Sequence, residues 1–249
     1  MNTYKINFNP SADQIAEIKE WLLEEDNVAG EGFFCNWSSI TQSFTDDKIA
    51  VLVSGQKTIG FISWFEWEKV ARIQLSEIKP DERKKGFGRC LAEKLFEKLT
   101  KKGFLVVDLH CQPAVSEKVW KRLGFKRFPD VKDYEYENSK DGPYLYKVLV
   151  PFLKPTKSAR PNETIELWHA EPHQITDISP KLKWHPKFEK GTTNLLIPII
   201  SPAKRDWQIN WIKNDRLIKN DKIKYFSRDE IDFGNFIIIE KLPLPTSVL

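Results

Sequence analysis

Apolar and polar positions in residues 1–153 switch between the two-residue period of a strand and the longer period of a helix. Tyr4 to Phe8 alternates as a short strand does, and Ser11 with Gln14 gives a capping-box start to a helix that ends near Glu25. The pattern then predicts a helix at 36–44 and three strands at 49–53, 58–67 and 70–78. A helix from Phe87 to about residue 101, a strand at 104–109 and a short helix at 115–123 follow. The last strands are predicted at 125–128 and 144–150, with a polar hairpin at 130–142 between them.

The second part of the chain has a different pattern. Residues 154–161 contain Pro155 and Pro161 and have the composition of a linker. Beyond them, short apolar runs bounded by turn residues predict strands at 164–168, 195–200, 207–212, 223–226 and 236–239. The sequence therefore predicts an α/β (α+β) domain at 1–153 and a small β-rich domain at 162–249.

Composition limits the class of protein. The chain has 249 residues and three cysteines, Cys35, Cys90 and Cys111, without a C-x-x-C pair, which is typical of reduced thiols in a cytosol. No stretch approaches the roughly 18 apolar residues of a membrane helix, and the first residues do not resemble a signal peptide. The net charge is only +4, with a slight basic excess after residue 155, so nucleic acid is weakly supported as a partner. We expect a cytoplasmic protein with no membrane contact.

The segment between the predicted strand at 70–78 and the helix from Phe87 has the features of an anion site. Gly86 and Gly88 leave neighbouring amide N–H groups uncovered by side chains. They lie where a helix N-terminus presents unpaired donors and the positive end of its dipole. Positive charge is added by Arg83, Lys84, Lys85 and Arg89. We interpret the backbone of residues 84–89 as a cradle for a pyrophosphate.

Three kinds of phosphate loop could contain these glycines. A Walker loop needs G-x-x-x-x-G-K-[ST], which is absent, and a dinucleotide fingerprint needs a glycine where Leu91 stands. The remaining pattern, hydrophobic-x-P-x-x-R-x-x-G-x-G, resembles the acetyl-CoA motif of the GNAT N-acetyltransferase superfamily, Q/R-x-x-G-x-G/A, through Arg83, Gly86 and Gly88. A second segment, VWKRLGF from Val119 to Phe125, is similar to the family's lYekLGF at the expected distance downstream.

The resemblance covers residues 1 to about 153 and implies a mixed, mostly antiparallel sheet flanked by helices. It also implies transfer of an acetyl or longer acyl group from CoA to an amine by direct attack, with acetyl-CoA as co-substrate and a small molecule or a protein as acceptor. The cofactor contacts that it implies are the strand backbone of Ser76, Glu77 and Ile78 and the loop residues Arg83, Lys84, Lys85, Gly86, Phe87, Gly88 and Arg89.

Acid and base groups are less clearly marked. Trp120 stands where family members often have a tyrosine that protonates the leaving thiolate, and an indole cannot supply that proton. Ser116, one turn earlier, is a candidate hydroxyl, although a serine there is more often a helix cap. Glu66, on the strand before the motif strand, and His110, after the following strand, are candidate general bases, and a water chain could replace them.

Other residues suggest how an acceptor would be held. Alternation predicts that Arg72, Gln74 and Ser76 share one face of the motif strand, so Arg72 could bind an acceptor carboxylate or phosphate. Aromatic residues expected either around the acceptor or in the core are Phe33, Phe34, Trp37, Trp64, Phe65 and Trp67. We expect no metal site, because nothing completes a ligand set with His169, His173 and His185.

Two other functions stay open. A GNAT-fold protein that binds CoA with little or no catalysis is favoured by Trp120 and the unmarked base. An acetyltransferase toxin or modifier acting on tRNA or another macromolecule has slight support from the basic C-terminal region. That region could select the acceptor, pair two protomers as a homodimer, or bind a macromolecule.

Overall fold

A computed structural model describes residues 4–30, 32–129, 142–157, 162–169, 173, 179–228 and 230–242. The chain forms two compact units. The first comprises described residues 4–127 and 142–149, and the second comprises 128–129 and the described part of 150–242. The expected polar hairpin at 130–142, apart from Gly142, and linker residues 158–161 lie outside the described residues.

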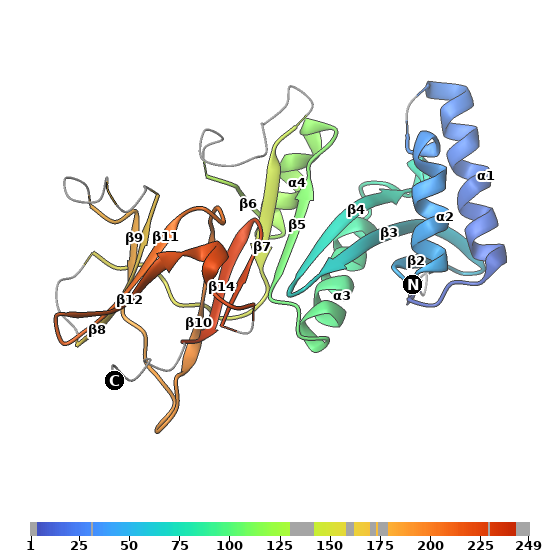
Figure 1. Cartoon of the computed structure of the whole chain (residues 1–249). Helices are drawn as coiled ribbons and strands as arrows, with labels where there is room; N and C mark the ends of the chain where they lie inside the picture. The colour runs from blue at the N-terminus through green and yellow to red at the C-terminus, as the bar shows by residue number, and fades with distance from the viewer. Residues whose placement is uncertain are drawn as a thin grey trace. The chain divides into compact units, whose positions relative to one another are not determined.

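The first unit contains a seven-stranded sheet with the order β1-β2-β3-β4-β5-β7-β6, in which only the β4–β5 pair is parallel. The predicted mixed, mostly antiparallel sheet flanked by helices is therefore confirmed (Figure 1). Its elements are β1 (Tyr4–Asn7), α1 (Ala12–Ala29), α2 (Trp37–Thr45), β2 (Ile49–Ser54), β3 (Lys57–Trp67), β4 (Val70–Ile78), α3 (Phe87–Lys101), β5 (Val106–His110), α4 (Glu117–Arg122), β6 (Lys126–Arg127) and β7 (Tyr144–Val148).

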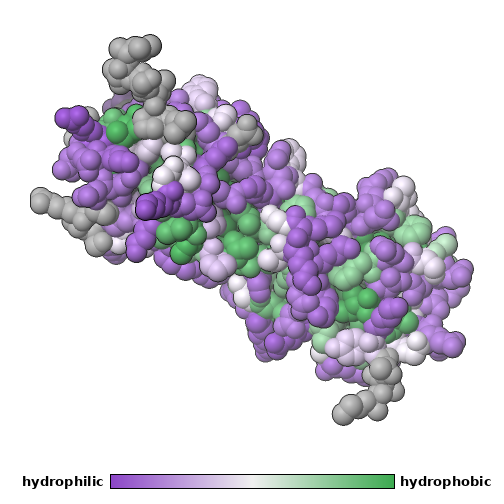
Figure 2. Space-filling view, turned by 90° about the horizontal axis from the view of Figure 1, so that it is seen from below, coloured by the Kyte–Doolittle hydropathy of each residue, from purple (hydrophilic) through white to green (hydrophobic). Residues whose placement is uncertain are grey.

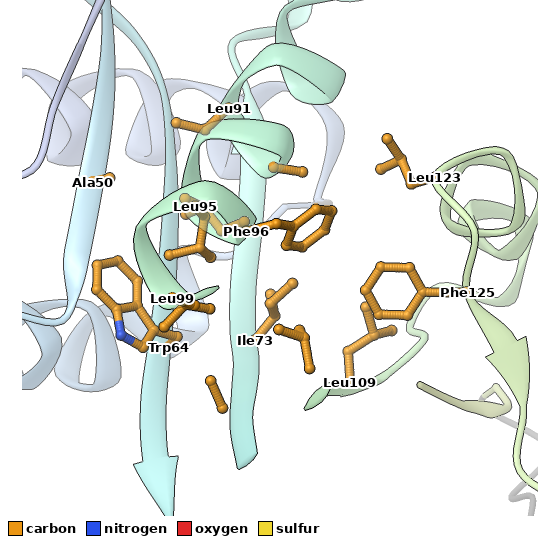
Figure 3. Close-up of a cluster of buried hydrophobic side chains, with 14 of the residues drawn as sticks. Ala50, Trp64, Ile73, Leu91, Leu95, Phe96, Leu99, Leu109, Leu123 and Phe125 are labelled. Atoms are coloured by element: carbon orange, nitrogen blue, oxygen red, sulfur yellow. The ribbon is translucent and has the colours of Figure 1, made fainter. Parts of the chain in front are cut away.

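Each face of this sheet is covered by a different set of helices. On one face, Ile18 and Leu22 of α1 and Ile40 of α2 pack against Phe61 and Leu75 of the sheet. On the other face, the predicted helix from Phe87 is α3, and it buries one apolar side against the sheet. Figure 3 shows this second cluster, in which Leu91, Leu95, Phe96 and Leu99 of α3 meet Trp64, Ile73, Leu109 and Phe125. The two faces are called the α1–α2 face and the α3 face below.

The first helix is longer than its apolar pattern predicts. The Ser11–Gln14 capping box is present, with Gln14 N–H donating to Ser11 Oγ and Ser11 N–H donating to Gln14 Oε1. The helix does not end near Glu25 but continues to Ala29, because Gly30 adopts a left-handed conformation (φ 61°) that closes it. Its last turn exposes Val28, so no apolar periodicity marks that turn. Glu25 is consequently part of the helix.

A β-bulge in β4 changes which side chains share a face. The register between β3 and β4 shifts between Ser63 and Trp64, which leaves Gln74 as an extra residue on β4. Ile73 before the bulge packs on the α3 face, whereas Leu75 after it packs on the α1–α2 face. The expectation that Ser76 shares a face with Arg72 and Gln74 is therefore wrong. Ser76 instead pairs with Ile62, on the α3 face, and Glu77 pairs with Phe61, on the α1–α2 face.

The second unit is built from β-strands, as predicted. Its strands form a four-stranded sheet, β12-β11-β8-β9, and a three-stranded sheet, β10-β14-β13. Their bounds are β8 (Glu163–Trp168), β9 (Leu182–Trp184), β10 (Asn194–Pro202), β11 (Gln208–Lys213), β12 (Arg216–Lys222), β13 (Ile231–Phe233) and β14 (Phe236–Lys241).

Three of these strands, β9, β12 and β13, were not predicted because they are short or polar, as in the Arg216–Lys222 sequence RLIKNDK. The strand expected at 223–226 is wrong. Residues Ile223–Tyr225 form a 3-10 turn, with the Phe226 N–H donating to the carbonyl of Ile223. On the face drawn in Figure 2, hydrophilic residues surround smaller hydrophobic areas.

Candidate cofactor site and its surroundings

β4 and β5 separate partway along their length. Their parallel pairing begins at Val70 and Val106 and ends at Ile73 and Leu109. β4 nevertheless stays paired with β3 on its other side as far as Ile78. β5 stays paired with β7 on its other side from Val106 to His110, which lies opposite Tyr144. The C-terminal half of β4 therefore presents one open edge toward the space between β4 and β5.

The antiparallel ladder determines which main-chain groups face this open edge. The Lys79 N–H donates to the carbonyl of Ile59 at 2.9 Å, so the same two-residue alternation directs the backbone of Glu77 and Leu75 toward β3. The backbone groups of Ser76 and Ile78 then face the opening. The Ile78 carbonyl already accepts a hydrogen bond from Arg83 Nε at 2.8 Å. The donors that face the opening are the N–H groups of Ser76 and Ile78.

The loop after β4 has the conformation of an anion cradle. Lys84 (φ 65°) and Gly86 (φ 86°) are both left-handed, and Gly86 is the N-cap of α3 without a side-chain cap. The first helical hydrogen bond of α3 runs from Cys90 N–H to the Gly86 carbonyl, so the N–H groups of residues 87–89 precede the helical ladder. Residues 83–86 are exposed. The loop thus presents main-chain donors and the positive helix end to solvent.

The two glycines are explained differently. Glycine is favoured at position 86 because the backbone there is left-handed, although a Cβ would meet nothing within 4 Å. Gly88 lies in the first turn of α3, and a Cβ would only make an ordinary 3.6 Å contact with Ile78 Cγ1. Alanine would favour the helix at this position by about 1 kcal/mol. The protein itself gives no reason for glycine at 88, and the motif Q/R-x-x-G-x-G/A also allows alanine there. The loop can hold an anionic group at the helix end.

Most of the cations around the loop are paired with carboxylates. Lys85 Nζ lies 2.8 Å from Glu82 Oε2, and Arg89 Nε lies 2.8 Å from Glu93 Oε1. Both pairs are exposed and contribute little to stability. Lys84 has no recorded partner among the described residues. The electrostatic attraction of an anion to this loop therefore depends more on the backbone donors than the sequence indicated.

Arg83 is held by two acidic side chains from different elements. Its Nη2 lies 2.6 Å from Glu25 Oε1 on α1 and 2.7 Å from Glu77 Oε1 on β4. Both glutamate side chains are only 9 % exposed, while Arg83 is 42 % exposed. Burial, followed by the neighbouring charge of Glu25, raises the pKa of Glu77 to about 7. The sequence pattern marked Glu77 only as a backbone contact and did not identify Glu25.

Glu66 lies away from the loop. Its carboxylate pairs with Lys48, accepts a 3.0 Å hydrogen bond from Trp64 Nε1, and lies 3.6 Å from Lys102 Nζ. Lys102 is the C-cap of α3, whose 15 residues span about 22 Å from the loop end. Although burial acts to raise it, these partners lower the pKa of Glu66. The structure does not bring Glu66 and the loop together.

His110 and Ser116 lie after β5. The His110 ring stacks on Tyr144 at a centroid distance of 4.5 Å, and its Nε2 lies 3.2 Å from the Gly142 carbonyl oxygen. Ser116 Oγ donates to the Pro113 carbonyl at 2.9 Å and lies 3.1 Å from Cys111 Sγ, so it makes no cap hydrogen bond. Burial raises the pKa of the Cys111 thiol.

Trp120 and Arg72 are occupied in packing and ion pairing. Trp120 packs edge-on against Phe125 at 5.2 Å and adds to the core on the α3 face. Arg72 forms a two-pronged pair with the buried Asp108, Nε–Oδ1 and Nη2–Oδ2 both at 2.7 Å. Since this pair already uses the Nε and Nη2 donors, the geometry gives little support for Arg72 as the ligand of an acceptor anion.

A pocket of about 230 Å³ lies between α2 and the bulge of β4. Its lining comprises Ser38, Ser39, Gln42, Ser43, Asp46, Lys48, Trp64, Phe65 and Gln74. Ser43 Oγ donates to Gln74 Oε1 at 3.0 Å, which links the helix to the bulge. Of the aromatic residues considered for the acceptor, only Trp64 and Phe65 line this pocket. Phe33, Phe34 and Trp37 pack against the core on the α1–α2 face, and Trp67 is exposed.

Two further features concern other ligands and membranes. Within the described ranges, no three His, Cys, Asp or Glu side chains are grouped so that they could hold a metal ion. Among the helices that the structure describes, none is long and apolar enough to cross a membrane.

Comparison with known proteins places these features in a family. Residues 13–125 match the model of the acetyltransferase (GNAT) family. No curated protein sequence matches the chain. Among solved structures, the chain is similar to the PaiA N-acetyltransferase of Thermoplasma acidophilum in complex with coenzyme A, with 17% identity and a TM-score of 0.45 over 59% of this chain and 99% of that one.

Two more solved structures have similar values. The ribosomal-protein-S18-alanine N-acetyltransferase of Escherichia coli shares 14% identity over 59% of this chain and 94% of its own, with a TM-score of 0.47. An aminoglycoside 6'-N-acetyltransferase complexed with coenzyme A shares 10% identity over 60% of this chain and 98% of its own, with a TM-score of 0.49. Residues 13–125 match the family model, and they form most of the mixed sheet from which the loop after β4 extends. They are therefore a domain of the GNAT acetyltransferase family.

Proposed function

We propose that this protein transfers an acetyl group from acetyl-CoA to an amine by direct attack of the amine on the thioester. The observation that carries the proposal is the open edge of β4 leading directly into an exposed loop of main-chain donors at the start of α3. A CoA molecule needs both features, because its pyrophosphate requires donors and its pantetheine arm requires an extended strand edge. Membership of the GNAT family supports the same reaction class.

Each chain segment has a separate role in this proposal. The N–H groups of residues 86–89 bind the pyrophosphate, and Lys84 adds an exposed positive charge. The N–H groups of Ser76 and Ile78 bind the pantetheine arm and the thioester carbonyl. A donor on that carbonyl stabilises the negative charge that develops on its oxygen as the amine attacks. These contacts use the backbone alone, so the side chains at 76 and 78 are free to vary.

The acceptor amine binds on the α1–α2 face. The pocket beside the bulge supports this location, because Gln74 contributes a side chain to the pocket and immediately follows the last β4–β5 pair. Its lining is rich in hydroxyl and carboxamide groups and includes the aromatic side chain of Phe65. Such a lining suits a small polar amine that carries its own hydrogen-bonding groups.

The proposal is tested by measuring CoA affinity and thiol release on the same preparations. Titration calorimetry with CoA is compared between the natural protein, Gly86→Glu and Gly103→Glu. The two glycines are matched, with φ 86° and 90° and nothing within 4 Å of an added Cβ, but they lie at opposite ends of α3. We expect Gly86→Glu to abolish CoA binding and Gly103→Glu to retain it.

Thiol release from acetyl-CoA with a panel of small amines and amine-bearing peptides then tests catalysis. Turnover with at least one acceptor supports the enzyme. Tight CoA binding without turnover on any acceptor would instead favour a GNAT-fold protein that binds CoA with little or no catalysis. Trp120 motivates this alternative, because it lacks the hydroxyl that could protonate the leaving thiolate. Equal CoA affinity in both glycine variants would refute the loop as the pyrophosphate site.

A further inference from the structure

The buried pair Glu25 and Glu77 lies beside the open edge of β4. Glu77 directly follows Ser76, whose N–H faces that edge, and its side chain extends to the α1–α2 face, where the acceptor is proposed to bind. Glu25 reaches it from α1. Gly32 lies against the Glu25 carboxyl group, since a Cβ added to it would lie 3.2 Å from Glu25 Oε2. Glu77 therefore lies on the face of the sheet where the acceptor is proposed to bind.

The charges in this cluster do not balance when both carboxyl groups are ionised. Two carboxylates share the single guanidinium of Arg83, and both acidic side chains are about nine-tenths buried. The second oxygen of each, Oε2, is buried and has no hydrogen-bond partner among the described residues. A proton held between the two carboxyl groups would satisfy these oxygens and remove the excess charge. The pair is thus built to gain and lose one proton.

The facing groups explain why this proton is exchanged near neutral pH. Glu25 on α1 and Arg83 after β4 are the charged groups that act on Glu77. Burial and the charge of Glu25 raise its pKa to about 7, and Arg83 opposes them. A general base functions best when its pKa is near the working pH. Glu66, by contrast, is held as a carboxylate by its ion pair with Lys48, although Lys48 itself lines the pocket.

We propose that the Glu25–Glu77 pair accepts the proton of the attacking amine, an inference that rests on the acetyl transfer proposed above. The pair, with both carboxyl groups ionised, takes a proton from the acceptor ammonium, and the freed nitrogen lone pair forms the C–N bond. The C–S bond breaks with its electron pair on sulfur, and a second amine proton passes to that sulfur. The products are the acetamide and the CoA thiol, and the proton held by the pair returns to solvent.

Glutamine variants test this role, because they keep the shape of the side chain and remove its titration. In Glu77→Gln we expect kcat to fall by about 10²–10⁴-fold, the usual contribution of a general base, with CoA affinity within twofold of the natural protein. In Glu25→Gln, Glu77 loses its neighbouring charge, so the midpoint of the rising limb of kcat/KM against pH should move to lower pH. Glu97→Gln, on the exposed side of α3 away from the pair, is the control and should match the natural protein.

Each outcome bears on the proposal. An unchanged rate and pH profile in Glu77→Gln would overturn it while leaving the acetyl transfer intact. Parallel loss of CoA affinity and rate in Glu77→Gln would also overturn it, because the pair would then only hold Arg83 and the loop in place. Absence of turnover in the natural protein, with CoA bound, would instead refute the proposed function itself.

Discussion

Arg72 and Asp108 join β4 and β5 one residue before the two strands separate. Both hydrogen bonds of the pair measure 2.7 Å, and the last paired residues, Ile73 and Leu109, follow immediately. Asp108 is 1 % exposed, and its burial raises its pKa while Arg72 opposes the rise. The pair therefore holds together the closed end of the opening that the proposed pantetheine arm enters.

Removing one partner of this pair should be costly. Arg72→Ala leaves Asp108 buried without its guanidinium, so we expect the free energy of unfolding to fall by about 3 kcal/mol. Arg89→Ala removes an exposed pair with Glu93 and should cost less than about 1 kcal/mol. Urea denaturation of both variants measures the difference. Equal losses would show that Arg72 contributes no more than a surface ion pair.

The two loop glycines should respond differently to alanine. Gly88→Ala places a favourable residue in the first turn of α3, so it should keep or raise stability by up to about 1 kcal/mol. The motif Q/R-x-x-G-x-G/A accepts alanine at this position, so CoA affinity should stay within about threefold of the natural protein. Gly86→Ala should instead lower stability by about 1–2 kcal/mol because of its left-handed backbone. Thermal unfolding with calorimetric titration checks both, and a lower stability in Gly88→Ala would show that the fold itself needs glycine at 88.

Glu77 should make the protein less stable as pH rises. The unfolded chain loses this proton near its ordinary pKa of 4.5, whereas the folded protein keeps it until pH approaches about 7. Stability is therefore full below pH 4.5, falls between 4.5 and 7, and stays lower above 7, by a total on the order of 3 kcal/mol.

Glu77→Gln removes this titration. Its stability relative to the natural protein should therefore increase as pH rises from 4.5 to 7. Urea denaturation of both proteins at several pH values measures this difference, and titrating groups that do not interact with Glu77 cancel from it. A difference that does not change with pH would mean that Glu77 is ionised in the folded protein throughout this range.

The sequence predicted features that depend on a short stretch of residues, such as a loop motif. It predicted less well the features that depend on contacts between distant parts of the chain. Gly86 was a reliable signal for the loop because a left-handed N-cap needs glycine locally, whereas the backbone at Gly88 would accept alanine. The bulge at Gln74 was not predictable from alternation, because an added residue leaves both flanking segments with normal strand patterns. The position of Ser76 was wrong for this reason.

Long-range pairing explains the other differences. Arg83 was expected to contact the cofactor, but Glu25 and Glu77, far apart in the chain, both reach it once α1 covers the sheet. Glu25 was not predicted as part of a site, because the helix was expected to end there. In the second unit, the polar strand β12 forms because β11 offers a free edge to pair with, which composition does not reveal.

Trp120 should act through packing and not through its N–H group. Its indole packs against Phe125 in the core on the α3 face, so Trp120→Phe keeps most of the contact and should cost less than about 1.5 kcal/mol of stability. The acetyl-transfer rate should stay within about threefold, less than roughly 0.7 kcal/mol in the barrier. Steady-state kinetics at saturating acetyl-CoA checks this. A much larger loss of kcat in a folded variant would indicate that the indole N–H serves the leaving thiolate.

Filling the pocket beside the bulge should affect the acceptor alone. Ser39 lines the pocket from α2, and Ser39→Phe would occupy much of its volume of about 230 Å³. We expect the acceptor KM to rise roughly tenfold or more with little change in kcat, which is the signature of lost binding common to ground and transition states. CoA affinity should not change, because the proposed CoA contacts come from the edge of β4 and the start of α3. Thr45→Phe, on an exposed position of α2 outside the lining, is the matched control. If both variants bind the acceptor equally well, the amine does not use this pocket and must enter the α1–α2 face elsewhere.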